Sequence, residues 1–210
     1  MKNSTNAETI AFYDVPLVCG AAPSIGCGSR AKPLLVDLER QVPIKEAWLN
    51  RTGTILAIVW CGPPRMEEVG RPVFERHEVQ YAEVPDDKQA AQFFRIDRRW
   101  FRGAEVDRLS LEEAREIAET SVPSVTEEGR VAIEEASRIK TDIEAYFRKE
   151  LVRFRTREEL QQDAQSKFPE AVISIYQKHI GRKRTAAVQN HGVRSPFKHA
   201  GREEIATCCP

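Results

Sequence analysis

The chain has 210 residues, of which 41% are hydrophobic and 30% are charged, and its 32 basic residues balance its 32 acidic residues. This composition is typical of a globular protein and excludes a wholly disordered chain. The zero net charge excludes a general attraction to nucleic acid or to anionic membranes. Because we find neither a long apolar run nor a signal peptide, we expect a cytoplasmic protein without a membrane span.

The first third of the chain predicts a small unit of strands and helices that begins near Phe12, after a loose terminus. A predicted strand over 14–19 is followed by a loop rich in glycine and proline. Ser29 is a typical N-cap residue, and the helix that it opens should end before Pro43. The helix is predicted from apolar residues at helical spacing, which are Ala31, Leu34, Leu35 and Leu38.

Two β-rich runs, residues 44–50 and 54–60, predict a hairpin with a tight turn between them. A weak helix over 65–78 and a fourth strand over 79–84 complete the unit. The order β, α, β, β, α, β is that of a four-stranded antiparallel sheet with two helices on one face. We therefore predict an α+β protein in which residues 12–84 form a ferredoxin-like βαββαβ sandwich.

Helix-forming patterns dominate residues 86–181, which predict a helical extension, a helical hairpin or a small bundle. A short helix is expected over 89–96 and a last one over 168–181, and residues 182–210 are expected to be a disordered tail. Two patterns are typical of capping boxes at helix starts, namely Ser110-x-x-Glu113 and Thr156-x-x-Glu159. The longest predicted apolar stripe consists of Ile139, Ile143, Tyr146, Phe147, Leu151 and Phe154.

The order of the first elements and the sequences of residues 25–32 and 42–59 resemble the heavy-metal-associated domain family. This small module occurs in copper chaperones, mercury-binding proteins and metal-pumping ATPases. In that family, two cysteines on the loop after the first strand bind a soft cation between their thiolates. The resemblance covers roughly the first third of the chain, and it implies that a soft metal ion such as Cu(I) or Hg(II) is bound.

The predicted metal ligands are Cys19 and Cys27, which lie at either end of one loop. When Cys27 is aligned with the first family cysteine, Arg30 occupies the second position, so Cys19 is the nearby replacement. Cys27 precedes a predicted helix and lies near Arg30 and Lys32, an environment that favours the thiolate. We therefore predict that Arg30 and Lys32 activate the thiol.

Further thiols and basic clusters have weaker interpretations. Cys208 and Cys209 form a vicinal pair that could be additional soft-metal ligands, whereas Cys61 is typical of a packed residue at the opposite end of the sheet. The basic aromatic cluster at 98–102 and the basic run at 181–184 could contact phosphates. Without net positive charge or a nucleic-acid-binding motif, nucleic acid is not an expected partner.

Our leading interpretation is soft-metal binding and transfer by Cys19 and Cys27, with delivery to a partner protein and with dimerisation or docking through the C-terminal helices. One alternative is an interaction or assembly protein whose ferredoxin-like domain holds no metal. A second alternative is a thiol redox or sulfur-carrier protein that uses Cys27 alone. We find no phosphate-binding glycine loop, zinc-protease motif or nucleophile elbow, so the sequence does not positively indicate an enzyme.

Overall fold

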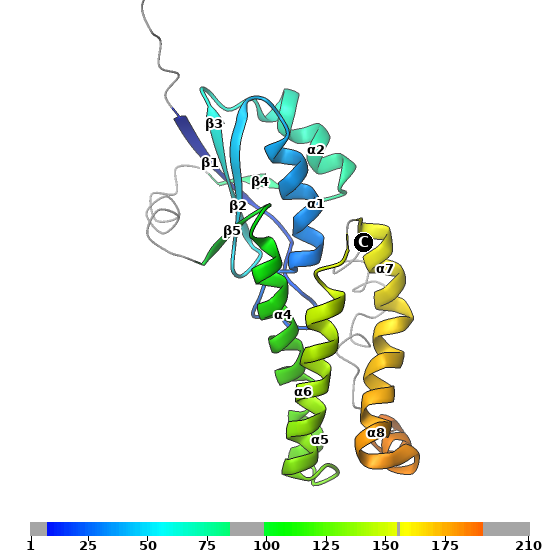
Figure 1. The fold of residues 1–210 in the computed structure, drawn as a ribbon. Helices are drawn as coiled ribbons and strands as arrows, with labels where there is room; N and C mark the ends of the chain where they lie inside the picture. Colours follow the sequence, from blue (N-terminus) through cyan, green and yellow to red (C-terminus); the bar gives the residue numbers. More distant parts are fainter. Residues whose placement is uncertain (1–7, 85–98, 155, 191–210) are drawn as a thin grey trace, which may run out of the picture.

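The computed structural model describes residues 8–84, 99–154 and 156–190. It has two parts, a β-sheet with helices packed against it and a set of long helices that extends away from one end of the sheet (Figure 1). The two parts meet where α1 of the sheet contacts α4 and α7 of the helical part. No helix within the described ranges is both long and apolar enough to cross a membrane.

The sheet is antiparallel and has five strands in the order β4-β1-β3-β2-β5. Strand β3 lies at its centre and is almost entirely buried from Leu56 to Trp60, as expected for a run of large and β-branched side chains. The strands are β1 (Glu8–Asp14), β2 (Ile44–Asn50), β3 (Ile55–Cys61), β4 (Ala82–Glu83) and β5 (Trp100–Arg102).

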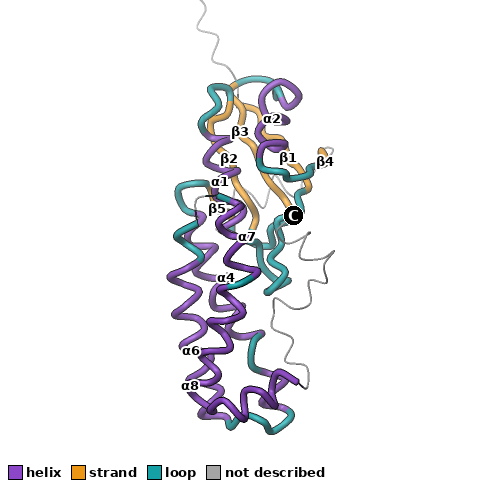
Figure 2. Tube along the Cα trace, turned by 90° about the vertical axis from the view of Figure 1, so that its right-hand side faces the viewer, coloured by secondary structure: helices purple, strands orange, loops and turns teal. Residues whose placement is uncertain are grey.

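Three helical segments accompany this sheet, namely α1 (Gly28–Glu39), the π-helical turn η1 (Met66–Gly70) and α2 (Arg71–Arg76). The apolar stripe of α1 is buried, with Leu34, Leu35 and Leu38 in one core together with Ile58 of β3. The strands form one layer and α1 and α2 another beside it (Figure 1), and in the turned view the two helices overlap the strands (Figure 2). This arrangement leaves the N-terminus of α1 pointing towards the long helices.

The second part contains α4 (Val106–Thr120), α5 (Pro123–Glu127), α6 (Ile133–Glu150), α7 (Arg157–Gln165) and α8 (Lys167–Asn190). Helix α6 packs between α4 and α8. Its predicted apolar stripe is confirmed, since Ile139, Ile143 and Phe147 are fully buried. Thr156 caps α7 as predicted, because its hydroxyl accepts a hydrogen bond from the Glu159 N–H at 3.3 Å.

The predicted hairpin is confirmed almost to the residue, but the first strand is displaced. Strand β1 begins at Glu8, so the prediction of a loose terminus up to residue 11 is wrong for residues 8–11. The predicted strand over 14–19 instead follows β1 as an irregular extended segment. The reason is that residues 8–14 find a full partner in β3, whereas Pro16 has no N–H to offer to a sheet.

The second half of the sheet departs from the predicted four-stranded plan. Strand β5 adds a fifth strand beside β2, and β4 is only two residues long. The predicted helix over 65–78 is divided at Gly70 into η1 and α2. Pro72, the second residue after Gly70, lacks the N–H that a continuous helix needs. The short helix expected over 89–96 lies outside the described residues.

Several predicted helix limits are also corrected. Helix α1 begins at Gly28, with Cys27 as its N-cap, and Ser29 is inside the helix, where its hydroxyl donates to the Leu151 carbonyl at 2.8 Å. The predicted helix end at Gly181 is confirmed, because Gly181 has φ 77° and ψ 158°, a non-helical conformation at which α8 kinks. A second helical stretch follows the kink and runs to Asn190, so the prediction of disorder is wrong for residues 182–190.

Candidate functional site

The loop after β1 folds back so that Cys19 and Cys27 lie on the same face of it. Val18 and Gly26 form an antiparallel bridge at the centre of the loop. Two backbone hydrogen bonds flank this bridge, from the Cys19 N–H to Ile25 at 2.8 Å and from the Cys27 N–H to Leu17 at 2.7 Å. Side chains alternate between faces along paired segments, so the residues on either side of the bridge project to the face opposite Val18.

Cys19 and Cys27 are therefore diagonal neighbours across the bridge. Diagonal neighbours in an antiparallel pair have Cα atoms about 7–8 Å apart. A disulfide requires Cα atoms within about 7 Å, so this register suits two separate sulfur atoms better than a covalent bond between them. Neither cysteine forms a disulfide, and each is only 6% exposed.

A carboxyl group from the other part of the molecule meets both thiols. Glu113 of α4 is hydrogen-bonded by the side chains of Cys19 and Cys27. It also accepts a hydrogen bond from the Gly28 N–H at 2.9 Å, which is the first backbone N–H of α1. Glu113 is 1% exposed, so two thiols, a carboxyl group and a helix N-terminus share one buried site.

The environment of Glu113 changes its acidity. Burial raises the pKa of this carboxyl from 4.5 to about 7, while the hydrogen bonds from Cys19, Gly28 and Cys27 oppose the rise. Desolvation favours the neutral acid, and hydrogen-bond donors favour the carboxylate. The buried group therefore exchanges a proton near neutral pH, where it can accept a proton that leaves a neighbouring thiol.

Close backbone packing holds the site together. A Cβ atom at Gly28 would collide with the Ser110 side chain and would lie 2.7 Å from the Ser110 backbone nitrogen. Ser110 is on the same face of α4 as Glu113, one turn earlier, and its hydroxyl is buried without a hydrogen-bond partner in the described structure. On the other side of the loop, a Cβ at Gly26 would lie 2.8 Å from the Gly53 Cα.

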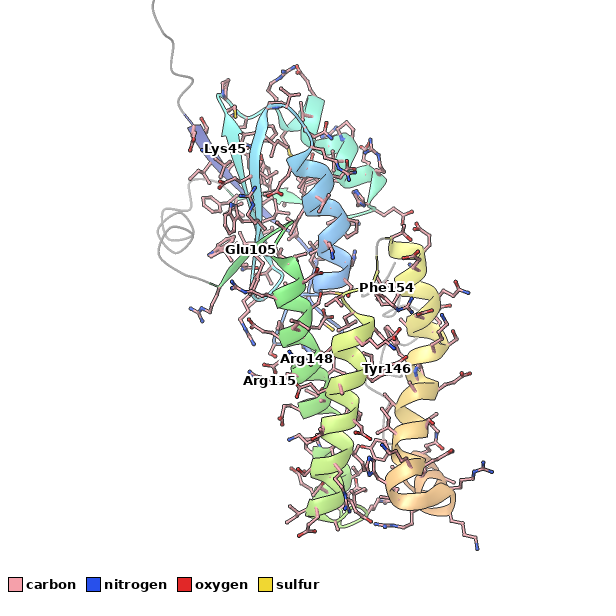
Figure 3. All side chains as sticks on the ribbon, viewed as in Figure 1. Lys45, Glu105, Arg115, Tyr146, Arg148 and Phe154 are labelled. Atoms are coloured by element: carbon pink, nitrogen blue, oxygen red, sulfur yellow. The ribbon has the colours of Figure 1, made fainter. Side chains whose placement is uncertain are left out.

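Polar contacts around the site fasten the sheet to α4. The Lys32 ammonium donates to Asp107 at 2.6 Å, and Arg51, on the β2–β3 turn, donates to Glu112 at 2.9 Å and to Glu116 at 3.1 Å. In Figure 3, Glu105 and Phe154 mark two sides of this junction, at the start of α4 and just after α6. The site therefore forms only when both parts of the molecule are folded.

The other sequence-predicted residues have varied positions. Arg30 is buried and its guanidinium donates to the Pro16 carbonyl at 3.0 Å, and Lys32 is paired with Asp107. Their predicted role in thiol activation stays a prediction. Cys61 is exposed at the end of β3, opposite Glu8, so the prediction of a packed residue is wrong, because this last residue of the strand lies beyond the buried run that ends at Trp60. Cys208 and Cys209 lie outside the described residues.

The basic aromatic cluster is part of the fold rather than an open surface. Trp100 is 7% exposed and Phe101 is 1% exposed, so both rings are buried. Arg102 donates to Glu39 at 3.0 Å, which gives its charge an internal partner. These positions remove the aromatic stacking surface that the sequence suggested for phosphates and bases.

Glu113 is the site residue whose role the sequence did not reveal. Its spacing from Ser110 predicted a capping box, but α4 already begins at Val106, so both residues lie inside the helix and face α1. The three-residue spacing is also the spacing that places two side chains on one helix face. The spacing of Ser110 and Glu113 therefore also indicated that the two side chains share one helix face.

Within residues 8–84, 99–154 and 156–190, no group of three or more His, Cys, Asp or Glu side chains is arranged to hold a metal ion. A tetrahedral site for zinc or iron is thus not supported there. A linear site needs only two sulfur ligands, so it does not require such a group.

Comparison of the chain with protein-family models, curated proteins and solved structures gives no match.

Proposed function

We propose that the protein binds a soft metal ion of the Cu(I) or Hg(II) type between the sulfur atoms of Cys19 and Cys27. The observation that carries the proposal is that both thiols are hydrogen-bonded to the same carboxyl group, that of Glu113. Two side chains that reach one small group from either side are also able to reach one ion. Thiolate sulfur is the ligand type that such ions prefer.

The spacing of the two cysteines supports a bridging ion. Metal–thiolate bonds are about 2.3 Å long for zinc, so two such bonds in line separate the sulfurs by roughly 4.6 Å. Diagonal residues of a bridged pair have Cβ atoms somewhat less than about 7 Å apart, which accommodates that separation without the approach that a disulfide needs. The ion here is a cargo that the protein carries.

The N-terminal part supports the same proposal at the level of fold. We infer a ferredoxin-like βαββαβ unit in which β5 is an addition at the edge, because the first four strands follow the order β4-β1-β3-β2. The resemblance to the heavy-metal-associated family rests on this order and on the position of Cys27 before α1. Glu113 stands apart from that resemblance, since it comes from the helical part.

Transfer to a partner protein belongs to the proposal. A thiol of the partner would add to the bound ion before Cys19 or Cys27 leaves, so the ion never becomes free in solution. The long helices offer surfaces for the partner or for a second copy of the chain.

A Cu(I) titration of the reduced full-length protein tests this function. One equivalent of Cu(I) should protect Cys19 and Cys27 from alkylation after rapid unfolding, as mapped by mass spectrometry. Cys19→Ser and Cys27→Ser should each abolish the protection, and the matched control Cys61→Ser should retain it. A folded protein that binds Cu(I) with equal affinity in the Cys27→Ser variant would contradict the proposal.

A further inference from the structure

A buried hydroxyl at the junction of α4 with the start of α1 has no role in the metal binding proposed above. Ser110 is 1% exposed, and within the described structure its Oγ has no hydrogen-bond partner. A buried polar group without a partner destabilises the folded state, so its presence calls for a physical reason. The hydroxyl lies against Gly28, the residue that follows Cys27 in the chain.

We propose that Cys27 is a site of reversible oxidation, at which a small hydroperoxide converts the thiol to a sulfenic acid that Ser110 and Glu113 hold. The Cys27 sulfur attacks one peroxide oxygen, an S–O bond forms and the O–O bond breaks. The thiol hydrogen ends on the leaving oxygen, which departs as an alcohol or as water. Sulfur loses two electrons and the peroxide gains them, so the step needs no other reactant.

The surroundings of Cys27 fit this product without any change in charge. In the reduced protein the thiol hydrogen-bonds to Glu113. After oxidation, the S–O–H group can donate to the same carboxyl group. The new oxygen can accept a hydrogen bond from Ser110, which supplies the partner that the serine hydroxyl lacks in the reduced state. Oxidation of Cys27 therefore gives the buried Ser110 hydroxyl a hydrogen-bond acceptor.

One feature distinguishes Cys27 from Cys19, and two features that the pair shares favour a lasting sulfenic acid. Cys27 is the N-cap of α1, a position at which the helix dipole favours electron-rich sulfur and oxygen. Its burial at 6% exposure limits the oxidant to small molecules and shields the sulfenic acid from bulky thiols. The diagonal register with Cys19 slows closure of a disulfide, so the sulfenic acid persists.

The test uses metal-free full-length protein in which Cys61, Cys208 and Cys209 are replaced by Ser. Hydrogen peroxide is added, the reaction is quenched in denaturant that contains a cyclic 1,3-diketone, and the labelled cysteine is located by tandem mass spectrometry. We expect the label on Cys27. Its lifetime should fall about tenfold in Ser110→Ala, the effect of losing one hydrogen bond worth about 1.4 kcal/mol.

The matched control is Ser121→Ala at the C-cap of the same helix, where the buried hydroxyl donates to the Ile117 carbonyl at 2.5 Å. This variant should keep the lifetime of the unsubstituted background. Ser110→Ala removes a hydroxyl that has no partner, so it should fold at least as stably, and urea unfolding verifies this. Label on Cys19, rapid formation of a Cys19–Cys27 disulfide, or equal lifetimes in the two serine variants would each overturn the inference.

Discussion

Replacing Glu113 with Gln should change how stability depends on pH. In the folded protein the pKa of this carboxyl is raised from 4.5 to about 7, mainly by burial. Below pH 4.5 the group is protonated in both the folded and the unfolded chain, and it costs nothing. As the pH rises towards 7, the unfolded chain loses the proton and the folded chain keeps it, so the free energy of unfolding falls.

The size of this effect follows from the two pKa values. At about 1.4 kcal/mol per pH unit, the fall between pH 4.5 and pH 7 amounts to about 3 kcal/mol. Glutamine has the same shape and a carbonyl acceptor for Gly28, but it cannot ionise. If burying the glutamine amide lowers the free energy of unfolding, it does so equally at both pH values, so this effect cancels in the comparison. Relative to the natural protein, Glu113→Gln should therefore gain about 3 kcal/mol between pH 4.5 and pH 8.

Urea unfolding followed by tryptophan fluorescence, under reducing and metal-free conditions at pH 4.5 and pH 8, measures this difference. Glu112→Gln is the matched control, because Glu112 is on the same helix and bonds Arg51 near the surface. The change in stability between the two pH values is compared between the two variants. A stability difference between Glu113→Gln and the natural protein that stays constant from pH 4.5 to pH 8 would refute the reasoning.

Three further variants test the packing by urea unfolding. Phe147→Ala should lose about 3–5 kcal/mol, because the ring is fully buried with its centroid 5.1 Å from that of Phe168, and a loss below 1 kcal/mol would show that this core is loose. Gly28→Ala should lose about 1–3 kcal/mol through collision with Ser110, and a neutral result would mean that α1 and α4 separate easily. Arg51→Ala should lose about 0.5–1 kcal/mol, since its two ion pairs with α4 are only partly buried, and a loss above 3 kcal/mol would contradict that ranking.

The central hairpin was the most predictable element because its information is local. Residues 44–50 and 54–60 are β-rich runs separated by a turn, and the structure places β2 and β3 within one residue of those limits. Strand β1 was harder to predict, because its limits depend on the partner strand. Residues 8–11 become ordered by pairing with Ile58–Cys61, far along the chain, and not by a pattern of their own.

The candidate site shows the same division between local and distant causes. The sequence could identify Cys19 and Cys27, since both flank one loop before a helix. It could not identify Glu113 as their neighbour, because that contact spans 85 residues between Gly28 and Glu113 and depends on how α4 packs against α1. The three-residue spacing of Ser110 and Glu113 indicates a capping box if a helix starts at Ser110, and a shared helix face if both residues lie inside the helix. The start of α4 at Val106 shows that the second interpretation is the right one.

The most direct measurement of the central claim is X-ray absorption at the copper edge of the full-length protein loaded with one equivalent of Cu(I). We predict a first shell of two sulfur atoms, with no nitrogen or oxygen neighbour, in the natural protein and in the Cys61→Ser variant. A shell that contains nitrogen or oxygen, or a two-sulfur shell that survives in both Cys19→Ser and Cys27→Ser, would contradict the account.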